Sequence, residues 1–208
     1  MITVIAGVNG AGKSSVVGSW IRAGGGAYFN PDEITRALME ENQNLTLDEA
    51  NGQAWKMGFD TLLSAIENDR DYTFETTLGG NSICKLLHAA LDKPIGVRIL
   101  FCGLAAPELH IKRVAARVGK GGHDIPEEKI RQRWSSSIHN LMTLIPRCSA
   151  VMVYDNSAEI IDGVLPAPIL LFSLSGDEFR SPPIADMPEW AKPLAAAAIK
   201  RNLGYPHQ

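Results

Sequence analysis

A glycine-rich segment near the start of the chain has the composition and spacing of a phosphate-binding loop. Gly7, Gly12, Lys13 and Ser14 occupy the fixed positions of the pattern G-x-x-x-x-G-K-[ST]. Glycines let such a loop turn its backbone N–H groups toward phosphate oxygens, and the N-terminus of the following helix adds a partial positive charge. A simple turn needs one glycine and has no use for Lys-Ser at this offset. The segment therefore predicts a nucleoside triphosphate site.

The residue types of this P-loop assign roles within the expected site. Lys13 is expected to place a mobile cation against the β- and γ-phosphates, and the Ser14 hydroxyl is the predicted ligand of Mg²⁺. ATP and Mg²⁺ are therefore the expected cofactors. The predicted nucleotide-binding residues are Asn9, Gly10, Ala11, Gly12, Lys13, Ser14 and Ser15.

Two carboxylates follow apolar runs that we interpret as strands. Asp32 comes after the run Ala27–Asn30, and Glu75 closes the run Tyr72–Glu75. Ligands of an open parallel sheet bind beyond the carboxyl ends of its strands, so both acids are candidates for the site. We predict Asp32 as the base that deprotonates an acceptor hydroxyl, and the alternative is a charge that stabilises a helix N-terminus. Glu75 is costly in a strand without partners, which favours a role in substrate binding.

Further polar residues extend the predicted acceptor site. Thr76 and Thr77 directly follow Glu75, and His123 lies in a glycine-rich segment. We predict that all three contact the acceptor together with Asp32 and Glu75. The alternative for the two threonines is capping of the next helix, and His123 has no second His or Cys near enough to form a metal site.

A basic segment at about residues 113–133 is expected to form a helical lid over the phosphates. Arg113 and Arg117 share one helix face, whereas Arg131 and Arg133 lie about 200° apart on the next helix. Arg131 and Arg133 therefore cannot both point at one phosphate. Of the two, Arg131 lies closer to the apolar stripe of the helix. Positive charge carried by a closing lid would stabilise a migrating phosphoryl group. The predicted catalytic residues are Lys13, Asp32, Arg117, Arg131 and Arg133, and the alternative for each arginine is a solvated surface position.

Short apolar runs alternate along the chain with segments of helical periodicity. This alternation predicts βαβ units. The expected fold class is α/β: a three-layer P-loop NTPase with a mostly parallel sheet of about five strands, helices on both faces and a helical lid. Residues 1–208 are expected to form one domain with a C-terminal extension at about 158–208. This extension would contain strand sequence at Leu165–Ser173 and a closing helix at Glu189–Arg201.

The composition of the chain argues against nucleic acid and membranes as partners. The chain of 208 residues has a net charge of −3, which gives no general attraction to nucleic acid. No apolar run approaches the length of a membrane span, so we expect no membrane partner and a cytoplasmic location. Cys84, Cys102 and Cys148 have no metal-type spacing and are expected to be reduced core thiols.

Five sequence motifs together resemble the zeta-toxin-like P-loop kinase family over about residues 1–157. Besides the P-loop they are Asn30-Pro31-Asp32, Phe74-Glu75-Thr76-Thr77, the Arg113/Arg117 pair with the Gly121–Pro126 segment, and Tyr154-Asp155-Asn156-Ser157. The resemblance implies phosphorylation of the 3′-hydroxyl of UDP-N-acetylglucosamine, with Asp32 as the base and Arg117 plus an arginine of the next helix as charge stabilisers. It also implies that Asn156 lies near the adenine side of the nucleotide, with a turn residue as the alternative, and that an antitoxin protein is a partner. The lid segment is shorter than that of the toxins, which leaves the pairing of the arginines open.

The function we favour is an ATP- and Mg²⁺-dependent kinase that transfers the γ-phosphate to a hydroxyl of a small acceptor, for which a nucleotide sugar is the first expectation. Three alternatives stay open. One is another nucleoside or metabolite kinase, and one is an ATP-binding regulatory or toxin module neutralised by an antitoxin. The third, a GTPase switch, is disfavoured because the chain has no NKxD sequence for guanine recognition.

Overall fold

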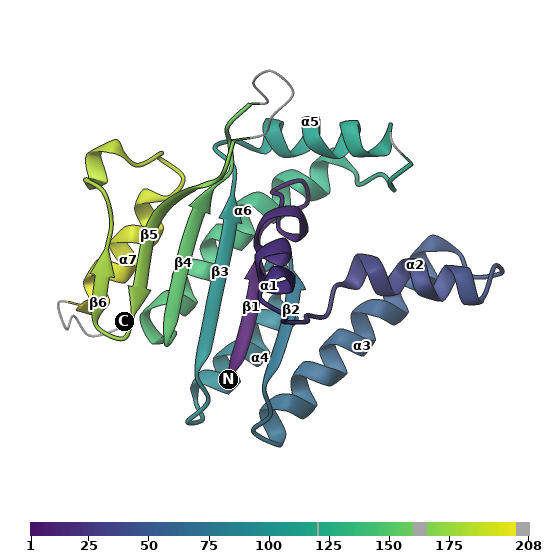
Figure 1. Cartoon of the computed structure of the whole chain (residues 1–208), viewed down its shortest axis with the longest axis horizontal. Coiled ribbons are helices and arrows are strands. Elements are labelled where there is room, and N and C mark those ends of the chain that lie inside the picture. The colour runs from purple at the N-terminus through teal and green to yellow at the C-terminus, as the bar shows by residue number, and fades with distance from the viewer. Residues whose placement is uncertain (120, 160–165, 203–208) are drawn as a thin grey trace.

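The computed structural model describes residues 1–119, 121–159 and 166–202. Its centre is a sheet with the strand order β2-β1-β3-β4-β5-β6 (Figure 1). The first four of these strands run parallel, and β5 and β6 are antiparallel to their neighbours. The bounds are β1 Ile2–Ala6, β2 Tyr72–Thr76, β3 Val97–Gly103, β4 Ala150–Asp155, β5 Ile169–Ser175 and β6 Glu178–Arg180.

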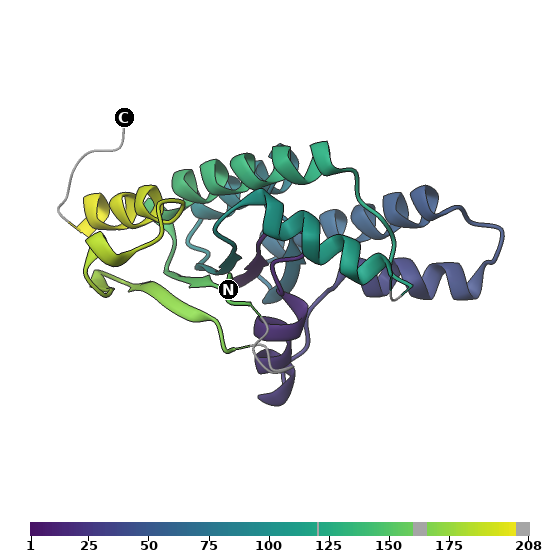
Figure 2. The ribbon, with the colours of Figure 1, turned by 90° about the horizontal axis from the view of Figure 1, so that it is seen from above.

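Helices α4, α6 and α7 lie on one face of this sheet, and the π-helical turn with the short α1 lies on the other (Figure 2). Ile2, Val4 and Ala6 of β1 belong to the large core cluster beneath α4, α6 and α7, whereas Ile5 packs against Val16 and Val17 on the other face. A β-strand alternates its side chains, so one short strand supplies both cores. The helices of the described residues are α1 Ser19–Ala23, α2 Pro31–Glu41, α3 Leu47–Glu67, α4 Asn81–Leu91, α5 Pro107–Val118, α6 Glu127–Leu144 and α7 Lys192–Asn202.

The sheet is mostly parallel, as the sequence predicts, and among the described residues it has six strands where about five were expected. The predicted strand Ala27–Asn30 is wrong, because only Phe29 pairs with the sheet, through a single bridge to Phe74. The side chain of Asn30 accepts a hydrogen bond from the backbone N–H of Asp32 and caps α2, so the chain turns into a helix after one bridge.

Helices α2 and α3 form a hairpin that projects beyond the β2 edge of the sheet (Figure 1). Thr46 and Glu49 form a capping box at the start of α3, which fixes where this long helix begins. The far end of α3 buries Leu62, Ala65 and Ile66 in the main core. This packing anchors the hairpin to the sheet, and the start of α2 at Pro31 and Asp32 lies beside the carboxyl ends of β1 and β2.

The C-terminal extension packs into the main core. Phe172 and Leu174 of β5 and Leu194 of α7 are buried there. Trp190 lies beneath the end of β3, where a Cβ on Gly103 would come within 2.3 Å of its ring. Strand sequence expected at Leu165–Ser173 corresponds to β5, although Leu165 itself lies outside the described residues.

The segment expected to act as a lid consists of the end of α5, a glycine-rich connection and the start of α6. Its closing motion stays a prediction. No helix among the described residues is long and apolar enough to cross a membrane.

The expected one-domain organisation implies that the extension unfolds together with the P-loop core. Trp190→Ala should lower the free energy of unfolding by about 3 to 5 kcal/mol, since a buried aromatic ring leaves a cavity. Trp20→Ala, at a position 46% exposed, is the matched control and should cost less than about 1 kcal/mol. Urea unfolding followed by circular dichroism measures both. Separate transitions for core and extension would contradict the prediction.

Candidate active site

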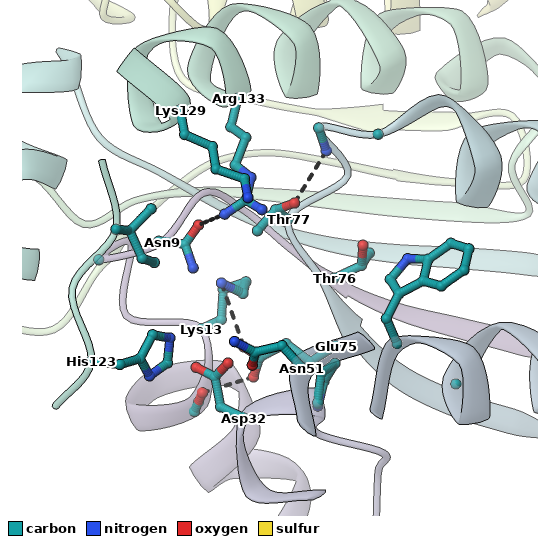
Figure 3. A pocket seen from close by; sticks show the side chains of 18 of the residues that line it. Asn9, Lys13, Asp32, Asn51, Glu75, Thr76, Thr77, His123, Lys129 and Arg133 are labelled. Atoms are coloured by element: carbon teal, nitrogen blue, oxygen red, sulfur yellow. Dashed lines mark hydrogen bonds and ion pairs between the residues drawn. The ribbon is translucent and has the colours of Figure 1, made fainter. Parts of the chain in front are cut away.

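A large cavity lies at the carboxyl ends of β1 and β2 and has a volume of about 1040 Å³. Its walls come from the P-loop, the α2–α3 hairpin, the segment between β2 and α4, and the facing parts of α5 and α6. Lys13, Asp32, Glu75, His123 and Arg133 all border this space (Figure 3). The topology therefore brings the predicted nucleotide-binding and acceptor-binding residues to one site.

The P-loop has the backbone conformation that its glycines allow. Gly7 has φ +143° and lies so close to β3 that a Cβ would come 2.2 Å from the carbonyl oxygen of Cys102. Gly12 has φ +89°, and a Cβ there would meet the side chain of Asn156 at 2.4 Å. Larger residues at either position would therefore displace the loop. A π-helical turn, Ser14–Gly18, connects the loop to α1.

Lys13, Ser14 and Glu75 form a compact polar cluster at the start of this turn. The Nζ of Lys13 lies 3.4 Å from Oε1 of Glu75, and both side chains are 8% exposed. The hydroxyl of Ser14 donates a hydrogen bond of 2.7 Å to Oε2 of the same carboxylate. Glu75 thus has the partners that its buried position in β2 demands. It contacts both P-loop residues that are expected to meet the phosphates and the metal.

Asp32 lies in the first turn of α2 and lines the cavity. Its Oδ2 lies 3.8 Å from Nη1 of Arg117, and its side chain is 44% exposed. The neighbouring Glu33 instead pairs with Arg22 at 2.6 Å on the outer surface. Of these two acids at the start of α2, only Asp32 is therefore in reach of a substrate in the cavity.

The two arginines of α6 have different surroundings. Arg133 lines the cavity and donates a hydrogen bond of 2.7 Å to Oδ1 of Asn9 in the P-loop, and burial lowers its pKa. Arg131 forms an exposed ion pair of 2.5 Å with Glu108 and is not part of the cavity wall. Of the two arginines that the sequence leaves open, Arg133 is therefore the one that borders the cavity. The close approach of Gly79 to the stem of Arg133, which a Cβ would meet at 2.9 Å, accounts for its position.

The segment after β2 is shaped by its threonines. The hydroxyl oxygens of Thr76 and Thr77 accept hydrogen bonds from the backbone N–H groups of Leu78 and Gly79. Leu78 has φ +54°, an unfavourable conformation for a side chain of its type, and is fully buried. Because the hydroxyl oxygens act as acceptors in these bonds, each threonine keeps an O–H that can donate. Both threonines line the cavity, where a ligand can accept this hydrogen bond.

Some of the remaining predicted residues line the cavity, and others are buried in or beneath the P-loop. His123, Ser15 and Gly10 line the cavity, whereas Ala11 is buried in the P-loop. Asn156 is also buried, and its amide donates a hydrogen bond of 2.8 Å to the carbonyl of Ala11. Asn156 is therefore placed beneath the P-loop and is not among the residues that line the cavity.

His110 of α5 is a supporting residue that the sequence analysis missed. It is 1% exposed, and its Nδ1 lies 2.9 Å from the carbonyl oxygen of Asn9. Burial lowers the pKa of His110 to about 4, so the ring is neutral near pH 7. A carbonyl only accepts, so Nδ1 must carry the proton and donate. A single histidine in an amphipathic helix gives no sequence signal for this role.

The donor atoms of the site suit ATP and Mg²⁺. The loop offers backbone N–H groups and Lys13 to phosphates, and Ser14 with Glu75 offers oxygen atoms, which Mg²⁺ prefers as ligands. The described residues contain no cluster of three or more His, Cys, Asp or Glu side chains that could hold a metal alone.

Comparison with known proteins identifies the family of this fold. Residues 2–136 match a family model, AAA_33, described as an AAA domain. The chain belongs to this family. The matched AAA domain spans the P-loop, both acids and the lid segment through Arg133, and the family assignment therefore covers every wall of the cavity.

Individual relatives of the AAA-domain chain are distant. An uncharacterized protein of Haemophilus influenzae is 28% identical over 128 residues, which are 62% of this chain and 88% of that protein. A chain of the AvrRxo1-ORF1:AvrRxo1-ORF2 complex, solved with sulphate ions, is 15% identical with a TM-score of 0.64, covering 95% of this chain and 63% of its own length. A chain of the PezAT toxin–antitoxin system of Streptococcus pneumoniae is 15% identical with a TM-score of 0.52, over 74% of this chain and 66% of that one. This chain thus spans about two thirds of the solved chains, and the likeness to them is one of fold.

The buried Lys13–Glu75 pair predicts strong coupling between the two positions. Lys13→Met leaves the carboxylate without its cation and should destabilise the protein by about 3 to 5 kcal/mol, whereas adding Glu75→Gln should recover part of this loss. The exposed pair Lys56–Asp60, at 2.5 Å, is the matched control. The double-mutant cycle of Lys56→Met and Asp60→Asn should give a coupling energy below about 1 kcal/mol. Urea unfolding of each variant gives both coupling energies. Additive effects at Lys13 and Glu75 would contradict the prediction.

Proposed function

We propose that the protein is an ATP- and Mg²⁺-dependent kinase that transfers the γ-phosphate to a hydroxyl of a small molecule. The observation that carries this proposal is the shared cavity, in which Asp32 and two arginines border the same space as the P-loop. A nucleotide switch needs no acidic residue beside an open volume of this size. The proposal is further supported by the fold likeness to an AvrRxo1-ORF1:ORF2 structure that was solved with ATP.

The transfer assigns a task to each side chain. The P-loop N–H groups and Lys13 hold the β- and γ-phosphates, and Mg²⁺ held by Ser14 would neutralise part of their charge. The acceptor oxygen attacks the γ-phosphorus, a new O–P bond forms, and the bond to the β-phosphate oxygen breaks. Asp32 takes the proton of the acceptor hydroxyl. Arg117 and Arg133 stabilise charge on the transferred group, while lid residues such as His123 reduce the access of water.

The resting contacts of the arginines fit this mechanism. Arg117 lies near Asp32, and Arg133 donates a hydrogen bond to Asn9 of the P-loop. Both arginines therefore lie between the proposed nucleotide site and the proposed acceptor site. A nucleotide that enters the P-loop would offer phosphate oxygens to both guanidinium groups. These arginines are thus positioned to respond to the nucleotide while they face the acceptor.

The identity of the acceptor and the biological role are finer parts of the proposal. The resemblance to zeta-toxin-like kinases implies UDP-N-acetylglucosamine as the acceptor, and the fold likeness to the PezAT chain supports an antitoxin partner. The alternative is a metabolic kinase without such a partner. Expression of the active protein and of Lys13→Ala in cells distinguishes the two, because only a toxin arrests growth in a P-loop-dependent way.

Asp32→Asn should lower kcat by about 100- to 10,000-fold, because the amide cannot accept the proton of the acceptor. The Kd for ATP should stay unchanged, since Asp32 is outside the P-loop. Glu33→Gln, one residue along the same helix and paired outward with Arg22, is the matched control and should keep full activity. Acceptor-stimulated ADP release measures kcat, and calorimetry measures ATP binding. Loss of ATP binding in Asp32→Asn would count against its assignment as the base.

The two arginines of α6 provide a second matched comparison. Arg133→Ala should lower kcat by about 100- to 1000-fold, since it removes a charge that faces the transferred phosphoryl group. Arg131→Ala removes the same side chain from the outer surface, where it pairs with Glu108, and should leave kcat near that of the unmodified protein. The same ADP-release assay measures both. Equal losses in the two variants would show that the position in the cavity does not decide the role.

A further inference from the structure

The cavity is divided by charge. All of its Lys, Arg and His residues lie on the P-loop and on the α5–α6 side. The opposite walls are formed by α2, α3, the end of β2 and the start of α4, and among the described residues they line the cavity with no basic side chain. Their ionisable groups are acidic, namely Asp32, Asp48 and Glu75. The basic set is Lys13, Arg113, Arg117, His123, Lys129 and Arg133. The acid among the lining residues of that side is Asp124, whose carboxylate accepts a hydrogen bond from the backbone N–H of Ile125.

Basic residues do occur on the opposite elements, but they are directed elsewhere. Lys56 of α3 pairs with Asp60 on the outer surface at 2.5 Å, and neither residue lines the cavity. Arg36 of α2 is exposed, and its Nε lies 3.4 Å from the backbone oxygen of Asp32. This wall therefore has no cation among the described residues because Lys56 and Arg36 lie on the sides of α3 and α2 that face away from the cavity.

An aromatic ring is the most prominent apolar feature of the acceptor wall. Trp55 of α3 lines the cavity and is 50% exposed, although large aromatic side chains are usually covered. One side of its ring packs on Phe59 with 5.1 Å between centroids, which limits its motion. A ligand in the cavity could cover the remaining surface. Aromatic rings attract both apolar ring faces and cations in this way.

Neutral hydrogen-bonding groups surround this ring. Asn51, one turn before Trp55 on α3, accepts a hydrogen bond of 3.0 Å from the hydroxyl of Thr35, which orients its amide and leaves the NH₂ group as a donor. Thr76, Thr77 and Ser82 add hydroxyl groups on the facing side of the cavity. Such groups recognise hydroxyls, whereas phosphates call for Arg or Lys.

We propose that the acceptor is a cyclic polyhydroxy compound that is uncharged or carries an amine, and that its ring stacks on Trp55. This inference rests on the proposed kinase function. An acceptor with its own phosphates would place them against Asp48, or would compete with ATP for the cations of the P-loop and the α5–α6 side. The charge division thus disfavours the nucleotide sugar that the sequence resemblance implies.

Calorimetric titration of the protein, saturated with a non-hydrolysable ATP analogue and Mg²⁺, tests the charge preference. The probes are glucosamine, glucose and glucose 6-phosphate, which share one ring and differ in charge, together with UDP-N-acetylglucosamine. We expect glucosamine and glucose to bind at least about tenfold more tightly than glucose 6-phosphate. Tighter binding of either phosphorylated probe would overturn the inference. So would the absence of binding by glucose and glucosamine at millimolar concentration while the ATP analogue still binds.

Variants of the aromatic position test the stacking contact. Trp55→Ala should weaken sugar binding by about tenfold, Trp55→Phe should recover most of it, and neither should alter the Kd of the ATP analogue. Trp20→Ala on α1, outside the cavity, is the control and should change neither affinity. Unchanged sugar binding in Trp55→Ala would overturn the stacking role.

The outcome also separates this inference from the kinase proposal. ADP release that depends on UDP-N-acetylglucosamine and is lost in Asp32→Asn would overturn the acceptor class and leave the kinase function intact. Sugar binding without ADP release from ATP would support the acceptor class and count against the kinase function.

Discussion

The buried ion pair between Lys13 and Glu75 is the contact on which the site depends. It joins the residue that the P-loop offers to phosphates with the carboxyl end of the neighbouring strand, and the parallel register that sets Ile5 opposite Glu75 fixes its geometry. Two charges removed from water are stable only when each compensates the other. The pair is therefore electrically balanced before a nucleotide binds. Under the proposed function, a triphosphate with Mg²⁺ would share Lys13 and Ser14 with Glu75, which would link occupancy of the P-loop to the end of β2.

Helix α6 makes a second link between the two halves of the cavity. At its beginning, Arg133 bonds to Asn9 in the P-loop. Further along, Ser136 donates to the carbonyl of Gly79, and Asn140 donates to that of Leu78, at 3.0 and 2.8 Å. These bonds hold Leu78 in its unfavourable backbone conformation and shape the segment that carries the acceptor-side threonines. A shift of α6 on substrate binding would thus be felt at the nucleotide and at the acceptor together.

Much of the fold and part of the site could be predicted from the sequence, because they depend on local spacing. The P-loop residues are consecutive, and the end of β2 located Glu75, whereas Asp32 was placed after a predicted strand of which the structure keeps one bridge. The predicted strand Ala27–Asn30 failed because apolar composition did not reveal that Asn30 would cap a helix. The choice between Arg131 and Arg133 depends on how closely a distant glycine approaches α6, and the support by His110 depends on burial beneath the P-loop. Contacts of this kind arise from tertiary packing and leave no periodic signal in the sequence.

The single bridge at Phe29 matters beyond the position of α2. The N–H and C=O groups of Phe29 bond to Thr73 and Glu75, so they occupy hydrogen-bonding positions on the outer side of β2. The other border of the sheet is β6, only three residues long, where Glu178 and Arg180 pair with each other. Exposed strand borders are the usual templates for uncontrolled pairing between molecules, and short, charged or covered borders suppress it. The same turn that delivers Asp32 to the cavity therefore also helps to keep copies of this protein from joining through their sheets.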